Sequence, residues 1–402
     1  MSHLQSFILS FLTIFPFKFY RTYLRHNIHT SRVEDIDSEW LGEHVKQVRA
    51  MLPGGMDIHG IFVVTNDNVL GNPKVKNKAF ECCKVIQNVR NVDASIPFTF
   101  LQIDLKCQIV KAEALLTSDQ NKTKLLSYEP GDLNWLCLKA NLILDLPLAF
   151  TKEQTERPLS QKLETAVKRL GNSLENAVFL INGQYMEKAQ HISPKSTVGV
   201  EKNSAKKKGK KNHQKEEITT TEPSEDEDGI YYSNRKKSKN IDVDILFDED
   251  GSNDCLLADI TAKMNIMGRM SVRAYVHERS NFEFAASAIK EDIIRTFKAR
   301  MEMHYDSLVG EEMGGTDANL PILHEPPRRV NICLPDNSIT VSDLLFPGET
   351  PEESVKAVEE MLGFSPQFEQ LDDELEIVAS PQTIKVKQPC KLQILLNTML
   401  FC

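Results

Sequence analysis

Apolar residues recur along this chain at two different periods, and each period predicts a different kind of element. Steps of three and four predict amphipathic helices at 38–52, 75–86, 159–174, 282–308 and 350–363. Between 136 and 146 every even residue is apolar, which predicts a half-buried antiparallel strand. Shorter apolar runs predict strands at 56–64, 98–110, 177–183, 241–245, 271–277, 328–335 and 339–346. This mixture favours an α/β or α+β body.

The first helix and the strand after it are separated by a short break. Asp37 or Ser38 is placed to cap the helix, and Pro53-Gly54-Gly55 ends it. Only three residues then reverse the chain before the strand begins near Met56. We therefore expect one of the two glycines to adopt a positive φ.

Residues 190–240 differ in composition from everything around them. Seven lysines lie in 202–215, seven acidic residues lie in 216–228, and apolar residues are nearly absent. Such a segment cannot bury enough surface to fold, so it predicts a disordered, charged linker of nearly zero net charge. The KKKGKK run at 206–211 resembles a nuclear signal, but the acids that follow favour a solvated linker.

The sequence predicts five parts along the chain, of which the charged linker is the third. An atypical N-terminal segment (1–32) is followed by an α/β domain (33–189), the charged linker (190–240) and a second α/β part (241–363). An acidic tail (364–402) ends in a short apolar stretch. The fold predicted for the two α/β parts is a mixed sheet with packing helices, interrupted by a disordered insert.

Two apolar stretches near the ends raise the question of a membrane. Residues 7–17 are interrupted by Pro16, and their basic residues follow rather than precede them, unlike a secretory signal. Residues 392–402 follow three lysines, which favour the cytoplasmic side of a membrane. Both stretches fall short of the roughly 20 residues that span a bilayer. The second one therefore resembles the opening of an anchor that this chain does not complete.

Composition excludes several classes of function. The net charge of −9 argues against a nucleic-acid coat, and 7% aromatic residues provide no stacking platform for single strands. The eight cysteines contain no CxxC pair, which argues against a zinc knuckle or a redox motif. Their apolar surroundings are typical of buried thiols in a reducing compartment. The chain is thus expected to face the cytosol.

The residues suggest little chemistry. Asp57 and His59 are two apart on a predicted strand, so they share a face and could meet one cation. Two ligands are too few for a closed zinc site, and a histidine bonded to backbone or solvent is the simpler interpretation. Neither a Walker-type loop nor a Gly-x-Ser-x-Gly motif occurs. We predict no enzyme activity, no cofactor, no metal and no catalytic residue; the alternative is a degenerate metallopeptidase-like hydrolase using Asp57 and His59.

Four motifs occur in order along the chain and resemble one family. They are Trp40-x-x-Glu43-His44-x-x-Gln47-Val48-x-x-Met51-Leu52-Pro53-Gly54-Gly55 followed by Gly60-Ile61-Phe62; Leu180-Ile181-Asn182-Gly183-Gln184; Arg273-Ala274-Tyr275-Val276-His277; and Arg329-Val330-x-x-x-Leu334-Pro335. Over about residues 33–362 this order resembles the signature of the Odr-four-like family. The signature residues are Trp40, Glu43, His44, Pro53, Gly54, Gly55, Gly60, Asn182, Gly183, Arg273, Tyr275, His277 and Pro335.

The resemblance implies a fold and a function. Members of this family look like distant, non-catalytic relatives of MPN-type folds, similar to the front part of the protease that removes the ubiquitin-fold modifier. They are adaptors at the endoplasmic reticulum membrane that support trafficking of odorant-type G-protein-coupled receptors. The implied partners are multi-pass receptor clients and that protease, and the implied location is the cytosolic side of the membrane. A regulatory partner of the protease with no receptor role is a further alternative.

Overall fold

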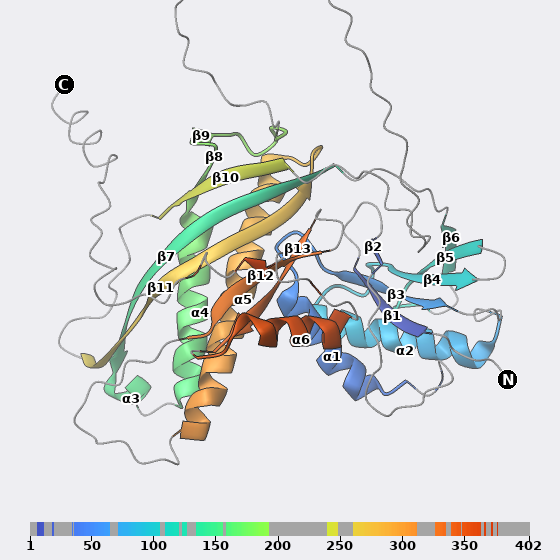
Figure 1. Ribbon diagram of the computed structural model, residues 1–402, viewed down its shortest axis with the longest axis horizontal. Helices are drawn as coiled ribbons and strands as arrows, with labels where there is room; N and C mark the ends of the chain where they lie inside the picture. The colour runs from blue at the N-terminus through green and yellow to red at the C-terminus, as the bar shows by residue number, and fades with distance from the viewer. Residues whose placement is uncertain are drawn as a thin grey trace, which may run out of the picture.

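A computed structural model describes most of the chain and shows three sheets packed with helices (Figure 1). The described residues are 6–11, 18–19, 34, 36–64, 71–104, 109–119, 123–126, 134–155, 158–192, 239–247, 260–311, 326–334, 339–346, 348–362, 366, 371–372 and 376.

The first sheet has the strand order β2-β1-β3-β4-β5-β6. Its strands are β1 (Ser6–Phe11), β2 (Lys18–Phe19), β3 (Ile58–Val64), β4 (Phe98–Asp104), β5 (Ile109–Leu115) and β6 (Thr123–Leu126). β3 runs parallel to β4, and the intervening helix α2 (Pro73–Arg90) makes the crossover that parallel strands require. α2 packs beside α1 (Ser38–Met51), and apolar side chains of both helices join the core of this sheet.

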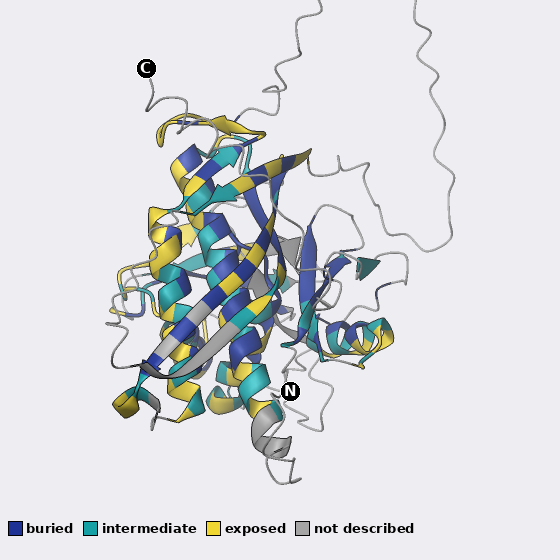
Figure 2. Ribbon diagram, turned by 90° about the vertical axis from the view of Figure 1, so that its left-hand side faces the viewer, coloured by how far each residue is buried: buried dark blue, intermediate teal, exposed yellow. Residues whose placement is uncertain are grey.

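The second sheet has the order β11-β7-β10-β8-β9. Its strands are β7 (Trp135–Thr151), β8 (Val178–Ile181), β9 (Gln184–Tyr185), β10 (Lys239–Leu246) and β11 (Ile260–His277). β7 and β11 form a long antiparallel pair from Trp135–His277 to Thr151–Ile260. Two long helices, α4 (Leu159–Asn176) and α5 (Phe282–Glu311), cover its inner face, and the short α3 (Lys152–Thr155) follows β7. Figure 2 shows the bands of buried and exposed residues along β7.

The third sheet is small and joins the other two. It contains β12 (Arg328–Cys333), β13 (Thr340–Leu345) and β14 (Leu371–Asp372) in the order β13-β12-β14, with helix α6 (Pro351–Leu362) against β13. Apolar residues of this sheet, of α6, of α1 and of the first sheet form one core, which also includes Trp135, Cys137 and Tyr275 of the second sheet. β7 and β11 thus lie between two hydrophobic cores.

The predicted fold class is confirmed: the chain is α/β, with mixed sheets and packing helices. The period-two pattern is confirmed as well, because Leu136, Leu138, Ala140, Leu142, Leu144 and Leu146 are all buried in the core beneath α4 and α5. The run at 98–110, where strand structure was predicted, contains β4 and the start of β5. The MPN-like description remains what the resemblance implies.

The division at 190–240 is not a division between domains. β7, β8 and β9 come from before the linker and β10 and β11 from after it, yet β10 lies between β7 and β8 in one sheet. The edges of the predicted linker are also structured, since Ile192 is buried and β10 begins at Lys239. Residues 193–238, where disorder was predicted, lie outside the described residues.

Both predicted end segments contribute strands to the body. β1 pairs antiparallel with β3, so part of the segment 1–32, which was predicted to be atypical, belongs to the first sheet. β14 pairs with β12, and Glu376 is 2% exposed, so part of the expected acidic tail is packed. Residues 392–402 lie outside the described residues, and within the described ones no helix combines the length and apolar character needed to span a bilayer.

Candidate functional site: a buried charged junction at the Pro-Gly-Gly turn

The turn after α1 is held against the second sheet by backbone hydrogen bonds. The amide of Gly54 donates to the carbonyl of Arg273 over 3.0 Å, and the amide of Tyr275 donates to the carbonyl of Gly54 over 2.9 Å. Gly54 therefore forms a parallel bridge with Ala274 on the free edge of β11. Two of the quoted motifs, far apart in sequence, meet at this contact.

The two glycines are needed for different reasons. A Cβ at Gly54 would lie 1.9 Å from the carbonyl oxygen of Ala288 in α5, so no larger residue fits there. Gly55 has φ of +75°, and a Cβ there would also lie 2.4 Å from the carbonyl oxygen of Tyr275. The expectation that one of the pair adopts a positive φ is confirmed for Gly55.

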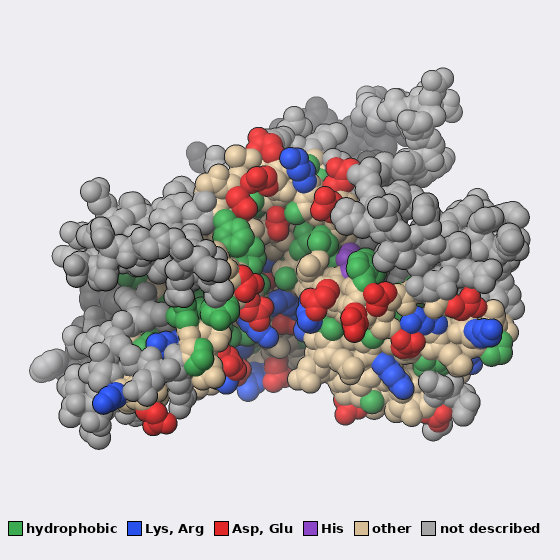
Figure 3. Space-filling model, turned by 90° about the horizontal axis from the view of Figure 1, so that it is seen from below, with side chains coloured by type: hydrophobic (Ala, Val, Ile, Leu, Met, Phe, Trp, Pro, Cys, Tyr) green, Lys and Arg blue, Asp and Glu red, His purple; other side chains and the backbone are tan. Residues whose placement is uncertain are grey.

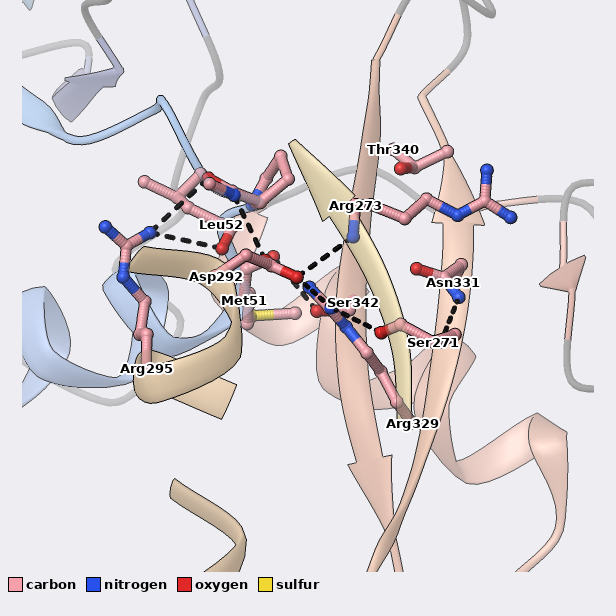
Figure 4. A network of polar contacts seen from close by, with 12 residues as sticks. Met51, Leu52, Ser271, Arg273, Asp292, Arg295, Arg329, Asn331, Thr340 and Ser342 are labelled. Atoms are coloured by element: carbon pink, nitrogen blue, oxygen red, sulfur yellow. Dashed lines mark hydrogen bonds and ion pairs between the residues drawn. The ribbon is translucent and has the colours of Figure 1, made fainter. Parts of the chain in front are cut away.

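Asp292 of α5 is the centre of a network beneath this turn (Figure 4). Its Oδ1 accepts from the Gly54 amide at 3.1 Å and from Arg329 at 3.0 Å; its Oδ2 accepts from the Arg273 amide at 2.9 Å and from Arg329 at 2.7 Å. Asp292 and Arg329 are each 1% exposed. Burial opposes the charge on Arg329, but the facing Asp292 carboxylate outweighs it and raises the pKa of the guanidinium.

A second buried carboxylate, that of Glu376, extends the network. It accepts from the amide of Ser271 at 2.6 Å and the amide of Arg329 at 2.7 Å, and it lies 2.7 Å from the guanidinium of Arg300. Glu376, in the segment after β14, thus joins that segment to β11, α5 and β12. Because both ends of each ion pair are buried, removal of one partner leaves a charge without compensation.

Arg295 of α5 connects the junction to the end of α1. Its guanidinium donates to the carbonyls of Leu52 at 3.2 Å, Pro53 at 3.4 Å and Met56 at 3.1 Å, and it also pairs with Glu291. A cation at the C-terminal end of a helix satisfies carbonyls that have no partner within the helix. The surface seen from below is hollowed near its middle, and acidic and basic side chains gather there together (Figure 3).

The chemistry available at this junction is limited by its own hydrogen bonds. Asp292 accepts four hydrogen bonds, which occupies all the acceptor directions of a carboxylate. The hydroxyl groups of Tyr275 and Thr340 are hydrogen-bonded over 3.1 Å, and either one can be the donor. Burial raises the pKa of the Tyr275 phenol. The arrangement holds neither a free base nor an activated nucleophile among these residues, so its role is to position elements.

The geometry also disfavours the hydrolase alternative. Asp57 lies 3.1 Å from Arg49 and 3.0 Å from Arg90. Burial alone would raise the pKa of this carboxyl, but the two guanidiniums and Arg295 lower it. Burial, with Arg90 nearby, lowers the pKa of His59 to about 4. Guanidiniums on both carboxylate oxygens repel a divalent cation, and the described residues include no group of three or more possible metal ligands.

The remaining signature residues are spread over several elements rather than gathered in one site. Trp40 stacks on His44 in α1 with ring centroids 4.9 Å apart, and exposed Glu43 pairs with Lys46 at 2.6 Å. A Cβ at Gly60 would lie 1.9 Å from the Thr99 carbonyl oxygen, so this glycine permits close approach of β3 and β4.

Asn182 and Gly183 have φ of 49° and 74° and form the two-residue turn between β8 and β9. Nδ1 of His277 accepts from the Arg279 amide at 3.1 Å, and the Arg273 guanidinium lies 2.9 Å from Asp372. Pro335 lies outside the described residues. Most of these residues are therefore explained by turns, close backbone approach and packing.

Sequence reasoning missed four charged members of the junction, namely Asp292, Arg295, Arg300 and Glu376, and it noted Arg329 only as part of a motif. One signal was present: Asp292 lies beside Ile289 and Ile293 on the apolar stripe of the long helix. A charge on a buried face requires a partner, but the pattern does not say which one.

Comparisons with known proteins agree with the motifs. A family model described as "ODR4-like: Odorant response abnormal 4-like" matches residues 21–373. The mouse "Protein odr-4 homolog" is 24% identical over 90% of this chain and 76% of its own length, and the human one is 23% identical over 85% and 72%. "Odorant response abnormal protein 4" of Caenorhabditis elegans is 23% identical over 89% of this chain and 72% of its own length.

Among solved structures, a UfSP from C. elegans aligns with a TM-score of 0.41 at 7% identity, covering 89% of this chain and 52% of that chain. A similarity of this size carries no argument about function. The family match, in contrast, extends over most of the chain and includes the turn, the β8–β9 hairpin, β11 and β12. This chain belongs to the ODR4-like family.

Proposed function

We propose that this chain is a non-catalytic adaptor that supports the folding, trafficking or membrane localisation of multi-pass, odorant-type G-protein-coupled receptors. It acts at the cytosolic side of the endoplasmic reticulum, as partner of the protease that removes the ubiquitin-fold modifier. The observation that carries this proposal is the family match over residues 21–373, together with the relative named for an abnormal odorant response. The receptor clients, the protease and the location come from the family resemblance.

The polar groups support a binding role rather than a catalytic one. The buried acids Asp292 and Glu376 are fully hydrogen-bonded, and Asp57 is paired with two arginines. Acid–base catalysis requires a group that exchanges its proton with a substrate, and these groups are committed to the fold. An adaptor, in contrast, needs only a rigid body and a surface.

The first test measures receptor delivery. In cells that lack this chain, the surface fraction of a tagged odorant-type receptor should fall and should return when the full chain is supplied. His59→Gln should restore delivery as well as the parent, since the adaptor role uses no chemistry at His59. Loss of delivery in a folded His59→Gln protein, or stoichiometric zinc in the purified parent, would favour the hydrolase alternative.

The second test addresses the partners. A tagged chain is expected to co-purify both the receptor and the modifier-specific protease from detergent-extracted membranes. If the protease is recovered without any receptor, and surface delivery does not depend on the chain, then the regulatory alternative replaces the adaptor.

A further inference from the structure

The outer face of the five-stranded sheet carries apolar side chains that belong to none of the cores formed by the described part of the chain. The inner face is covered by α4 and α5, and its residues alternate with the outer ones along each strand. Six outer positions are apolar and lie outside the core clusters that the described residues form: Ile143, Val178, Leu180, Tyr185, Leu246 and Met267. We call these six the outer patch. Tyr185 is 70% exposed and Ile143 is 53% exposed.

The strand register brings the members of the outer patch together. Leu180 pairs with Tyr185 across β8 and β9, and Val178 pairs with Leu246 across β8 and β10. β10 runs parallel to β7 and pairs Asp242 with Lys139. The ladder between β10 and β7 ends at that pair, and Leu246 and Ile143 are each four residues beyond it, on the same face as Asp242 and Lys139. Met267 adds a member on β11, so the outer patch is distributed over five strands.

A sheet built mainly of antiparallel strands, like this one, often leaves one face to solvent. The solvent-facing positions of such a sheet usually carry polar side chains. Here the outer positions of β8 and β9 are all apolar, and Leu246 and Ile143 continue the row onto β10 and β7. An exposed apolar surface rimmed by polar groups marks a binding surface.

The charges beside the outer patch indicate what it binds. Asp242 and Asp244 are exposed on the same face of β10, and the described residues provide no ion pair for either. Lys139 of β7 is the register partner of Asp242, and Arg269 of β11 is the register partner of Ile143. Lys139 offsets the charge of Asp242, but Asp244 lies opposite Leu180, so the part of the face beside β8 keeps a net negative charge and attracts cations. An anionic lipid surface or a nucleic acid would be repelled there.

We propose that the outer patch binds a basic amphipathic α-helix, whose apolar stripe lies over Ile143, Leu246 and Val178 and whose lysines or arginines reach Asp242 and Asp244. The inner face of this sheet already binds helices in this way, through the stripe Leu163, Ala166, Leu170 and Leu174 of α4. A helix on the outer face completes a helix–sheet–helix sandwich. Resting on the proposed function, the partner is a cytosolic segment of a multi-pass receptor next to the membrane, where lysine and arginine concentrate.

The test measures binding of a designed probe to the full chain. The probe is a fluorescein-labelled peptide of leucine and lysine, with leucines spaced to form one helical stripe, and binding is followed by fluorescence anisotropy. The double variant Ile143→Ser/Tyr185→Ser should bind about tenfold more weakly, because truncated central anchors typically cost at least 1–2 kcal/mol. Leu125→Ser, which removes a 74% exposed leucine from β6, should bind like the parent. Both variants should keep the parent's urea midpoint, because the changed side chains are exposed.

Asp244→Asn tests the charged half of the proposal. It should weaken binding about threefold at low salt and little at high salt, since exposed charge pairs are screened by salt. A peptide with glutamate in place of lysine should fail to bind the parent.

Several results would overturn the proposal. Equal affinity of the double variant and Leu125→Ser would show that the outer patch is not the binding surface. Sedimentation that shows a dimer of the parent, lost in the double variant, would assign the surface to a second copy of the chain. If the double variant binds no peptide but still delivers receptors, this inference about receptor segments is wrong and the adaptor function stands. If neither parent nor variant affects delivery while the peptide differences hold, the adaptor function is wrong and the surface stands.

Discussion

At the scale of single residues, two adjacent glycines illustrate how little space the turn allows. Gly54 is constrained by the carbonyl oxygen of Ala288, and Gly55 by its left-handed backbone as well as by the carbonyl oxygen of Tyr275. A methyl group at Gly54 would force apart two elements that carry a network of buried charges. The backbone contact, rather than conformational freedom alone, makes glycine necessary at Gly54.

Replacement of these glycines should therefore be costly. Gly54→Ala is expected to lower the free energy of unfolding by about 3 kcal/mol, the upper end of the cost of overpacking, and Gly55→Ala by at least about 1 kcal/mol. Gly268→Ala is the matched control, because a Cβ there meets no atom within 4 Å. Urea denaturation measures all three; a Gly54→Ala protein as stable as Gly268→Ala would contradict the described contact.

His44 predicts a pH dependence. It is 7% exposed, and burial lowers its pKa from 6.5 to about 4. Because the folded pKa is below the unfolded one, the stabilisation is fully present above pH 6.5 and is lost as the pH falls from 6.5 toward 4. At pH 5 the chain should be less stable than at pH 7 by about 2 kcal/mol from this residue alone.

The measurement compares urea midpoints at pH 7 and pH 5. His44→Gln should reduce the difference between the two midpoints, whereas His191→Gln, at an exposed histidine, should leave it unchanged. An unchanged pH dependence in His44→Gln would mean that His44 is not the group responsible.

At the scale of elements, the buried charges act between helices and strands that are distant in sequence. Asp292 joins α5 to the turn, to β11 and to β12. Asp292→Asn should cost about 3–5 kcal/mol, because it leaves the guanidinium of Arg329 buried without a full counter-charge. Glu43→Gln, which removes an exposed pair with Lys46, should cost less than about 1 kcal/mol.

A double-mutant cycle separates the pair from its surroundings. If the attraction is as described, Asp292→Leu combined with Arg329→Met should cost less than the sum of the two single changes. Strict additivity, measured by urea denaturation, would mean that the two side chains do not interact.

Glu376 makes a related prediction for the segment after β14. Its carboxylate accepts from the amides of Ser271 and Arg329, so Glu376→Gln should increase hydrogen exchange at these two amides. The amide of Val272, which lies between β11 and β7 in the continuous ladder, should keep its protection. Equal exchange in parent and variant would exclude Glu376 as the acceptor.

The elements themselves were largely predictable, but their partners were not. The even-numbered leucines of β7 and the stripe of α5 reflect burial on one face, which is a local pattern. The pairing of Asp292 with Arg329, or of Glu376 with Ser271, joins positions distant in sequence and leaves no local period. β1 was missed for a different reason: its apolar run resembled a membrane stretch, and only the pairing with β3 distinguishes the two.

At the scale of the whole molecule, the chain is one body whose parts interleave. β10 enters between β7 and β8, and it contributes Ile241 and Val243 to the core beneath α4 and α5. A cut in the charged segment 193–238 therefore should not separate the two sides.

This can be measured with a protease site inserted near residue 210. After cleavage, the two fragments should elute together in size-exclusion chromatography and should separate only in denaturant, because the sheet and its core are shared. A control site placed between Ser280 and Asn281, next to the hydrogen bonds that join His191 to Arg279 and Ile192 to Ser280, should resist cleavage. Fragments that separate without denaturant would mean that β10 does not lie within the sheet.

The position of β10 also has a consequence for biosynthesis. β7 and β8 are made first, but the strand that joins them emerges from the ribosome only after residues 186–238 have been translated. β11, which seals the other edge of β7 and receives the turn at Gly54, comes later still. Contacts between such distant positions slow folding and prolong the exposure of unpaired strands. The nascent chain therefore spends much of its synthesis with an incomplete sheet, in which both edges of β7 stay unpaired until β10 and β11 have been made.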